Sequence, residues 1–323
     1  CPVVCDKQGR ILLVGLNRPE KRNCLNVATA QQLLEAFHEF ERDSSVDVAV
    51  LHGKGGSFCA GYDLSELAED TPAEWPQVRH STLFLFEQTA GLTMVHYKLG
   101  RKCTKGAETH QTSRWHPGWD PMSEAGGYDL SELAEDTPAE WPQCIPETKK
   151  PTIAAVSGYA VGAGLELALW CDLRVVDETA VMGLFGRRFG VPLMAGGSAR
   201  LPALIGLSRA LDLVLTGRPL SAKEAHEIGL ANRVVSCGTA LGQAVSLAGS
   251  IVKFPQGCVQ ADRAAVYNAS SRDLSEAVAF ERQMASTVLC SEAVQGARRF
   301  LSGVGRHGSF NLFHSSTEPA AKS

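Results

Sequence analysis

The stretch KPTIAAVSGYAVGAGLELA, residues 150–168, decides the fold. Its apolar run Thr152–Val156 predicts a buried strand, a Gly-rich turn follows, and a helix is expected to begin near Gly162. Such a turn places backbone N–H groups at a helix N-terminus, where negative charge is stabilised. Glu166 stands one turn into this helix among apolar residues. A carboxylate beside converging N–H groups is suited to acid–base chemistry next to a carbonyl.

Two other interpretations of this stretch compete with this one, and the first is disfavoured by its broken glycine pattern. A dinucleotide-binding turn requires Gly-x-Gly-x-x-Gly, and Leu167 stands where the third glycine belongs. Alternatively, the turn is a structural helix start, with glycines for close packing and Glu166 at the surface. Isolated Gly-rich turns do not distinguish these possibilities.

A second segment repeats the pattern of strand, Gly-rich turn and helix start. Residues 46–53, VDVAVLHG, indicate a strand, and KGGSFCAGYDLSEL follows at 54–67. Asp63 and Glu66 have the spacing of a capping box, so a helix is expected to begin at Asp63 with Tyr62 just outside it. Two such turns can direct their N–H groups at one oxygen atom.

Taken in order along the chain, these segments resemble the crotonase superfamily, also called the enoyl-CoA hydratase/isomerase family. The matching landmarks are NRPEKRNCLN (17–26), SFCAGYDL (57–64), KPTIAAVSG (150–158), GAGLELA (162–168), CDLR (171–174), GGSARL (196–201), LTG (215–217) and GLANRVV (229–235). Each motif is modest alone, whereas the ordered set is specific. The resemblance runs from about Val4 to Arg306, with one interruption.

The resemblance implies an α/β fold, a crotonase-like spiral of ββα units with a C-terminal helical region, and assembly as a homotrimer or hexamer. It implies that the amides of Tyr62 and Ala163 form an oxyanion hole for the thioester oxygen of an acyl-CoA, with Glu166 as a catalytic glutamate. Coenzyme A would enter as part of the substrate, with no separate cofactor. The implied binding residues are Lys21, Arg22, Leu25, Ala60, Tyr62, Asp63 and Leu64.

The chain departs from the family pattern at the second catalytic glutamate, whose position is occupied by Gly186. The neighbouring Arg187 and Arg188 stay protonated and are poor bases, so they are structural or bind phosphate or a substrate carboxylate. Ala195 stands where some relatives use an aspartate as base. The chain is therefore interpreted as a member of a single-glutamate subgroup.

Three functions follow as hypotheses. The first is an enoyl-CoA hydratase/isomerase-like enzyme that stabilises a thioester enolate, with Glu166 as its acid–base group. The second is decarboxylation of a malonyl-type acyl-CoA, with an arginine near Gly186 holding the substrate carboxylate. The third is a non-catalytic protein that keeps coenzyme A binding. The acyl chain, and the choice among hydration, isomerisation and decarboxylation, stay open at this point.

Composition agrees with a soluble enzyme, and we expect an intracellular location, either mitochondrial or cytosolic. The 323 residues are 44% hydrophobic and 20% charged, and the net charge is −4. The chain has no stripe of basic residues, so nucleic-acid binding is not expected. The ten cysteines show no metal-binding spacing and are expected to be free thiols; Cys24 and Cys59 fall near the expected acyl-CoA site. No apolar run is long enough for a membrane span, and no metal site is expected.

Residues 61–77 recur without change at 127–143, offset by 66 positions. Identity over 17 residues differs from a structural repeat, which keeps a pattern and loses identity, so a recent duplication or a gene-modelling error is indicated. We expect the first copy to supply the oxyanion amide and Tyr128 and Asp129 to take no part. The segment between the copies is irregular, and its histidines lack metal-ligand spacing.

The remaining patterns predict scaffold. Residues 27–42 form one apolar helical face, and Ser221 and Glu224 have capping spacing before a short helix. Later helices are expected at 241–253, 255–268, 274–289 and 292–301. We therefore divide the chain into a core at 1–240, with the inserted segment at about 78–143, and a C-terminal helical region at 241–323.

Overall fold

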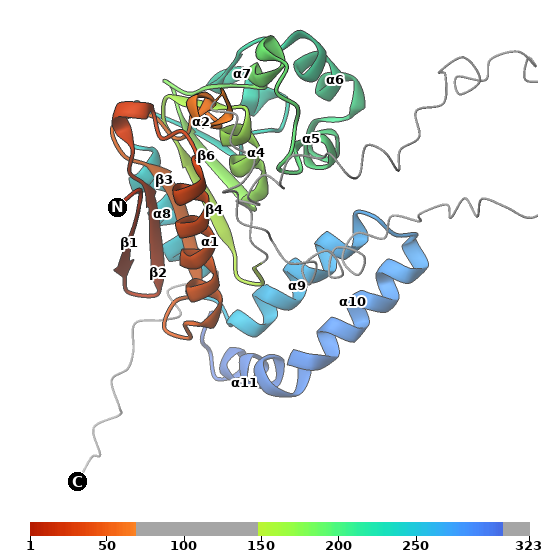
Figure 1. The fold of residues 1–323 in the computed structure, drawn as a ribbon. Coiled ribbons are helices and arrows are strands. Elements are labelled where there is room, and N and C mark those ends of the chain that lie inside the picture. Colours follow the sequence, from red (N-terminus) through yellow and green to blue (C-terminus); the bar gives the residue numbers. More distant parts are fainter. Residues whose placement is uncertain (69–147, 306–323) are drawn as a thin grey trace, which may run out of the picture.

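Six strands form the main sheet of the computed structural model, which describes residues 1–68 and 148–305 (Figure 1). Their order is β1-β2-β3-β4-β6-β9; β1 runs antiparallel to β2, and all later neighbours are parallel. The strands are β1 (Val3–Gln8), β2 (Ile11–Leu16), β3 (Val48–Gly53), β4 (Thr152–Val156), β6 (Leu173–Asp177) and β9 (Arg233–Val235). The predicted strand at Thr152–Val156 is confirmed at the centre of this sheet.

A second, smaller sheet continues the winding of the chain. It contains β5 (Tyr159–Val161), β7 (Val181–Gly183) and β8 (Leu220–Ser221). β5 pairs in parallel with β7, and β7 pairs antiparallel with β8. Because β4 passes directly into β5, and β6 into β7, each pair of strands contributes to both sheets. The predicted α/β class is confirmed.

Helices cover both faces of the main sheet. On one face, α1 (Val27–Arg42) and α4 (Ala163–Trp170) belong to the larger apolar cluster with alternate strand residues such as Val14 and Ala154. On the other face, α8 (Ala240–Ile251) buries Ala240, Ala244 and Ala248 against the intervening residues, among them Val50 and Ile153. Strands covered on both sides read as continuous apolar runs, which explains the composition of β2 and β4.

Shorter helical elements lie in the connections between the strands. They are η1 (Pro19–Lys21), α2 (Leu64–Ala68), η2 (Phe185–Phe189), α5 (Gly197–Ile205), α6 (Leu207–Thr216) and α7 (Ala222–Glu227). Ser221 caps α7 by accepting a hydrogen bond from the Glu224 N–H, as the spacing predicted.

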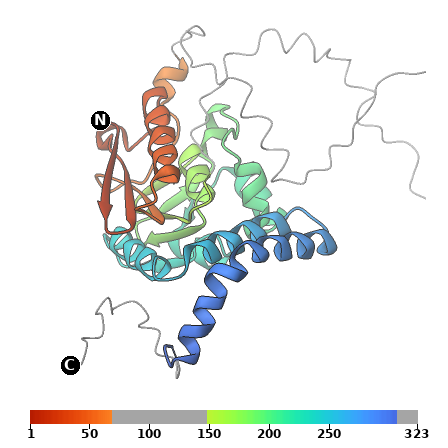
Figure 2. The same cartoon turned by 90° about the horizontal axis from the view of Figure 1, so that it is seen from below.

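The C-terminal helices α9 (Gln256–Ala269), α10 (Leu274–Val288) and α11 (Val294–Leu301) extend away from the sheet (Figure 2). Arg263 of α9 donates from Nε to both carboxylate oxygens of Asp172 at 2.9 Å, and the Tyr267 hydroxyl bonds to the same carboxylate. These contacts fix the start of the extension to the end of α4.

Two local predictions need correction. The helix near Asp63 begins at Leu64, and Glu66 accepts from the N–H of Val27 instead of completing a capping box with Asp63. The last helix begins at Val294, because residues 289–293 form a π-helical turn whose Glu292 accepts hydrogen bonds from the first N–H groups of α9. Both glutamates cap a helix distant in sequence, which local spacing cannot reveal.

Candidate functional site

The two predicted Gly-rich turns meet at the carboxyl ends of β3 and β4. Phe58 N–H donates to Ser157 C=O at 2.8 Å, and Cys59 N–H donates to Tyr159 C=O at 2.8 Å. Val161 N–H returns to Cys59 C=O at 3.1 Å. Three backbone hydrogen bonds therefore hold the turns side by side, although about one hundred residues separate them in the sequence.

Glycine is required where these turns touch. A Cβ atom on Gly164 would lie 2.1 Å from the Cys59 carbonyl oxygen. Gly61 has φ of +96°, and a Cβ there would lie 3.0 Å from the Val161 carbonyl oxygen and 3.7 Å from the Ala163 nitrogen. The backbone just before Tyr62 thus passes directly beside the first residue of α4.

Tyr62 and Ala163 each present a backbone N–H at this junction. Ala163 is the first residue of α4, where N–H groups have no acceptor within the helix. Leu25 donates to Gly61 C=O and accepts from Asp63 N–H, so the intervening Tyr62 N–H points away from Leu25. The two N–H groups lie on adjoining turns, one from each strand–turn–helix unit.

Glu166 is buried, with 1% of its surface exposed, and is not the surface residue of the structural alternative. Its Oε1 accepts hydrogen bonds from the N–H groups of Ala195 and Gly197, each at 2.9 Å. Burial raises the pKa of Glu166, whereas the N–H groups of Gly197, Ala195 and Met194 and the charge of Arg200 act to lower it. A larger fraction of Glu166 is therefore protonated near neutral pH than of an exposed glutamate.

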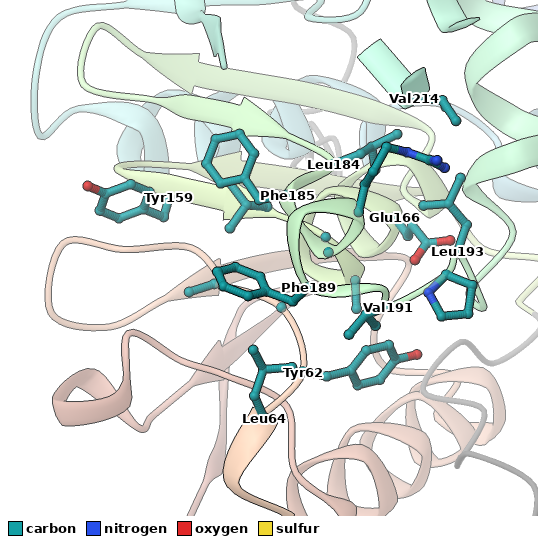
Figure 3. Close-up of a pocket in the computed structure, with 18 of the residues that line it drawn as sticks. Tyr62, Leu64, Tyr159, Glu166, Leu184, Phe185, Phe189, Val191, Leu193 and Val214 are labelled. Atoms are coloured by element: carbon teal, nitrogen blue, oxygen red, sulfur yellow. The ribbon is translucent and has the colours of Figure 1, made fainter. Parts of the chain in front are cut away.

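These groups line one cavity of about 250 Å³, shown in Figure 3. Tyr62, Ala163 and Glu166 contribute to its wall, together with apolar side chains from η2 and the loop that follows it. The apolar contributors include Leu64, Leu184, Phe185, Phe189, Val191, Leu193 and Val214. A mostly apolar cavity with a few converging polar groups is typical of a site for a small organic ligand.

The other predicted binding residues fall into two groups. Ala60, Leu64 and Arg22 line the cavity, and the Arg22 guanidinium lies 5.0 Å from the centre of the Tyr159 ring.

Leu25, Lys21 and Asp63 are not among the residues that line the cavity. Leu25 is buried and forms a parallel β-bridge with Tyr62. Lys21 is exposed at the end of η1. The carboxylate of Asp63 pairs with Arg18 at 2.8 Å. Asp63 therefore fixes the turn at 61–64 against the N-terminal segment.

Gly186, which occupies the position of the family's second catalytic glutamate, has little space for a side chain. A Cβ on Gly186 would lie 2.9 Å from the Val191 carbonyl oxygen, so a side chain there requires the η2 turn to shift. Arg188 donates to Gly217 C=O at 2.7 Å and stacks on Phe185, whereas Arg187 lines the cavity. The two neighbouring arginines thus have different surroundings.

Sequence reasoning missed the residues that hold Glu166. Ala195 lacks a side chain that could act as base, yet its backbone N–H bonds to the Glu166 carboxylate. Arg200 in turn donates to the Ala195 carbonyl at 3.0 Å. The glycine pair Gly196–Gly197 was the available signal, because glycines mark places of close backbone approach.

Some predictions fall on residues 69–147, which lie outside the described part of the chain. These include Tyr128, Asp129, the inserted segment and its histidines. In residues 1–68 and 148–305, no group of three His, Cys, Asp or Glu side chains has an arrangement that could hold a metal ion. Within the same ranges, no helix combines the length and apolar character needed to cross a bilayer.

Comparison with known families and proteins gives consistent matches over nearly the whole chain. The family model described as enoyl-CoA hydratase/isomerase matches residues 6–95 and 118–303. A probable enoyl-CoA hydratase of Rhizobium meliloti is 30% identical over 290 residues, covering 90% of each chain. The 2,3-dehydroadipyl-CoA hydratase of Escherichia coli is 30% identical, covering 90% of this chain and 91% of its own.

Solved structures agree with these sequence matches. An enoyl-CoA hydratase subunit from Geobacillus kaustophilus superposes with a TM-score of 0.68 at 30% identity, covering 94% of this chain and 95% of its own. An enoyl-CoA hydratase from Mycobacterium tuberculosis superposes with a TM-score of 0.68 at 28% identity, covering 93% and 96%. The fold described above is shared with both.

Proposed function

Because this chain belongs to the enoyl-CoA hydratase/isomerase family, the crotonase superfamily, we propose that it stabilises the enolate of an acyl-CoA thioester at the junction of its two Gly-rich turns. The thioester oxygen accepts hydrogen bonds from the N–H groups of Tyr62 and Ala163 as negative charge develops on it. The observation that carries the proposal is the placement of Glu166 in the same cavity as these two residues.

Glu166 serves as the acid–base group in this proposal. It removes a proton from the carbon next to the thioester carbonyl, the electron pair moves to the oxygen, and the N–H groups stabilise the resulting enolate. Return of the same proton to the γ-carbon of a 3-enoyl-CoA gives the 2-enoyl isomer. This isomerisation needs one carboxylate, whereas hydration is usually shared between two groups. The crowding at Gly186 therefore favours the isomerase side of the family's chemistry, in a single-glutamate subgroup.

The test is a mass-spectrometric and chromatographic panel with purified protein. Crotonyl-CoA, a 3-enoyl-CoA, methylmalonyl-CoA and ethylmalonyl-CoA are incubated separately, and products are scored for gain of water, change of double-bond position or loss of CO₂. Interconversion of 3-enoyl-CoA and 2-enoyl-CoA supports the proposal. Absence of turnover on all four, by a folded protein that binds coenzyme A, overturns it in favour of the non-catalytic hypothesis.

Decarboxylation of a malonyl-type acyl-CoA is the second candidate, and it rests on Arg187. This arginine lines the cavity beside Gly186, while Arg188 is held by Gly217 and Phe185. A guanidinium at that place can bind the carboxylate of the substrate before CO₂ leaves. Loss of CO₂ from methylmalonyl-CoA, abolished in Arg187→Gln and kept in Glu166→Gln, would select this reaction over isomerisation.

We expect Lys21 and Arg22 to contact the phosphates of coenzyme A. Replacing either with Gln should raise the dissociation constant for coenzyme A by up to about fivefold, because an exposed ion pair contributes about 1 kcal/mol or less. Isothermal titration at low and high salt measures the effect, which salt should reduce in the native protein. Lys223→Gln on α7 is the control, since Lys223 is 87% exposed and stands on a different element. Equal affinities for all variants would contradict these contacts.

We propose a homotrimer or hexamer assembled through the extended C-terminal helices. Leu274, Leu289, Phe300 and Leu301 are between 55% and 81% exposed in the single chain, and such apolar surface is expected to be covered by a neighbour. Light scattering should give three or six times the chain mass of 34.6 kDa. Phe300→Asp should lower that mass, because a charge would then enter the contact; a native protein that runs as a monomer would contradict the assembly.

A further inference from the structure

The carboxylate of Glu166 is held by a backbone turn instead of by another side chain. The N–H groups of Ala195 and Gly197 donate to Oε1 at 2.9 Å, and the N–H of Met194 also acts on the carboxylate. Two donors on one oxygen fix the direction of the carboxylate within the cavity. The placement of Glu166 therefore depends on whatever holds the turn itself.

The glycines of this turn leave room for two charged groups, one on each side. A Cβ on Gly197 would lie 2.8 Å from Glu166 Cγ and 2.9 Å from its Oε1. A Cβ on Gly196, which has φ of +84°, would lie 2.1 Å from Nη1 of Arg200. The carboxylate and the guanidinium thus occupy the space that side chains at these two positions would fill.

Arg200 is the side chain that reaches the turn from the opposite side. It stands in the first part of α5 (Gly197–Ile205), and its Nη1 donates to the Ala195 carbonyl at 3.0 Å. Ala195 is consequently bonded through its carbonyl to Arg200 and through its N–H to Glu166. A single residue connects the half-buried cation to the buried carboxylate.

We propose that Arg200 is a positioning residue for Glu166, which acts by holding the Ala195 carbonyl and thereby the turn that orients the carboxylate. The inference rests on the proposed role of Glu166 as acid–base group. Arg200 is separate from the residues that line the cavity, so it acts through the turn and not on the substrate.

The charges around the pair are consistent with this role. Burial lowers the pKa of Arg200, and Tyr267, Glu166 and Cys171 act to raise it, yet a guanidinium remains protonated in proteins. Its positive charge favours the ionised form of Glu166 and opposes the effect of burial. The other charged or titratable groups of the described cavity wall are Arg22, Arg187, Tyr62 and Tyr159.

The test measures the titration midpoint of the Glu166 carboxyl group directly, so it does not depend on whether the proposed reaction is found. Protein labelled with ¹³C at glutamate Cδ is titrated by NMR, and the Glu166 signal is assigned by its absence in Glu166→Gln. Arg200→Met should move the Glu166 midpoint to higher pH, because the cation that favours the carboxylate is lost. Arg200→Lys should move it less, and Arg209→Met, on the exposed face of α6, should leave it unchanged.

Turnover provides the second readout where the isomerase activity is present. Arg200→Met should lower kcat by about 10- to 100-fold with little change in KM, because a small misplacement of a catalytic group is costly while binding contacts remain. Arg200→Lys should recover part of this loss. Thermal melting verifies that each variant is folded.

A Glu166 midpoint that is the same in the native protein and in folded Arg200→Met overturns the proposal. It is likewise overturned if Arg200→Met and Arg200→Lys lose stability together without moving the midpoint, since that pattern indicates a purely structural arginine. If the native protein has no turnover but the midpoint moves as described, the positioning stands and the proposed function fails.

Discussion

Replacing Glu166 with Gln is expected to lower the rate of α-proton transfer by about 10²- to 10⁴-fold, the usual contribution of a positioned acid–base group. The measurement is exchange of the α-protons of butyryl-CoA with deuterated water, followed by NMR. This assay isolates proton transfer, and so it does not depend on which double-bond product the enzyme finally makes. Gln fills nearly the same volume and can still accept the N–H groups of Ala195 and Gly197 through its carbonyl oxygen.

Binding of coenzyme A should be unchanged in the same variant, because Glu166 is buried and the phosphate contacts are expected at the exposed Lys21 and Arg22. Glu178→Gln is the matched control, since Glu178 is exposed directly after β6. Exchange at the native rate in Glu166→Gln would remove Glu166 from the mechanism. A parallel loss in Glu178→Gln would point to a general loss of folded protein.

The pH dependence of exchange follows from the burial of Glu166. Proton removal requires the carboxylate, and burial raises the pKa of this group. The rate should therefore increase with pH through a midpoint above that of an ordinary glutamate. This rise of the exchange rate with pH is assigned to Glu166 if the residual activity of Glu166→Gln no longer shows it.

Local patterns in the sequence predicted those parts of the fold that local interactions determine. The helix predicted at 27–42 from its single apolar face has the bounds of α1. The structure adds that Asn26 caps this helix by accepting a hydrogen bond from the Thr29 N–H. The strand at 152–156 was predicted from its continuous apolar run. By contrast, β5, β7 and β8 have two or three residues each, which is too short for a recognisable period.

The candidate site shows the same division. The two turns and Glu166 could be identified because glycines and a carboxylate in an apolar helix stand out in the sequence. The turn at 194–197 could not be assigned to Glu166, because backbone N–H groups belong to every residue and carry no sequence signal of their own. Its partner lies about thirty residues away, and only the fold brings the two together.

Replacing Ala163 with Pro is expected to lower turnover by about 10²- to 10³-fold, the effect of removing one donor from an oxyanion site. Proline at this position removes the N–H and keeps the helix intact, because the first helical position tolerates proline well. Gly162 has φ of 54° and ψ of −127°, the mirror image of the extended conformation that a residue before proline prefers. Because glycine lacks a Cβ, it adopts an extended conformation and its mirror image about equally well. The turn before the substituted residue can therefore keep its shape.

A control separates loss of the N–H from damage by proline. Leu207 is the first residue of α6, its preceding Gly206 has φ of 82° and ψ of 157°, and it is 66% exposed and separate from the residues that line the cavity. Leu207→Pro should therefore keep full exchange activity. The substrate concentration at half-saturation should change little in Ala163→Pro, because the donor acts mainly on the charge that develops in the enolate. Native exchange in folded Ala163→Pro would mean that the thioester oxygen is stabilised elsewhere, and the pairing of Tyr62 with Ala163 would have to be abandoned.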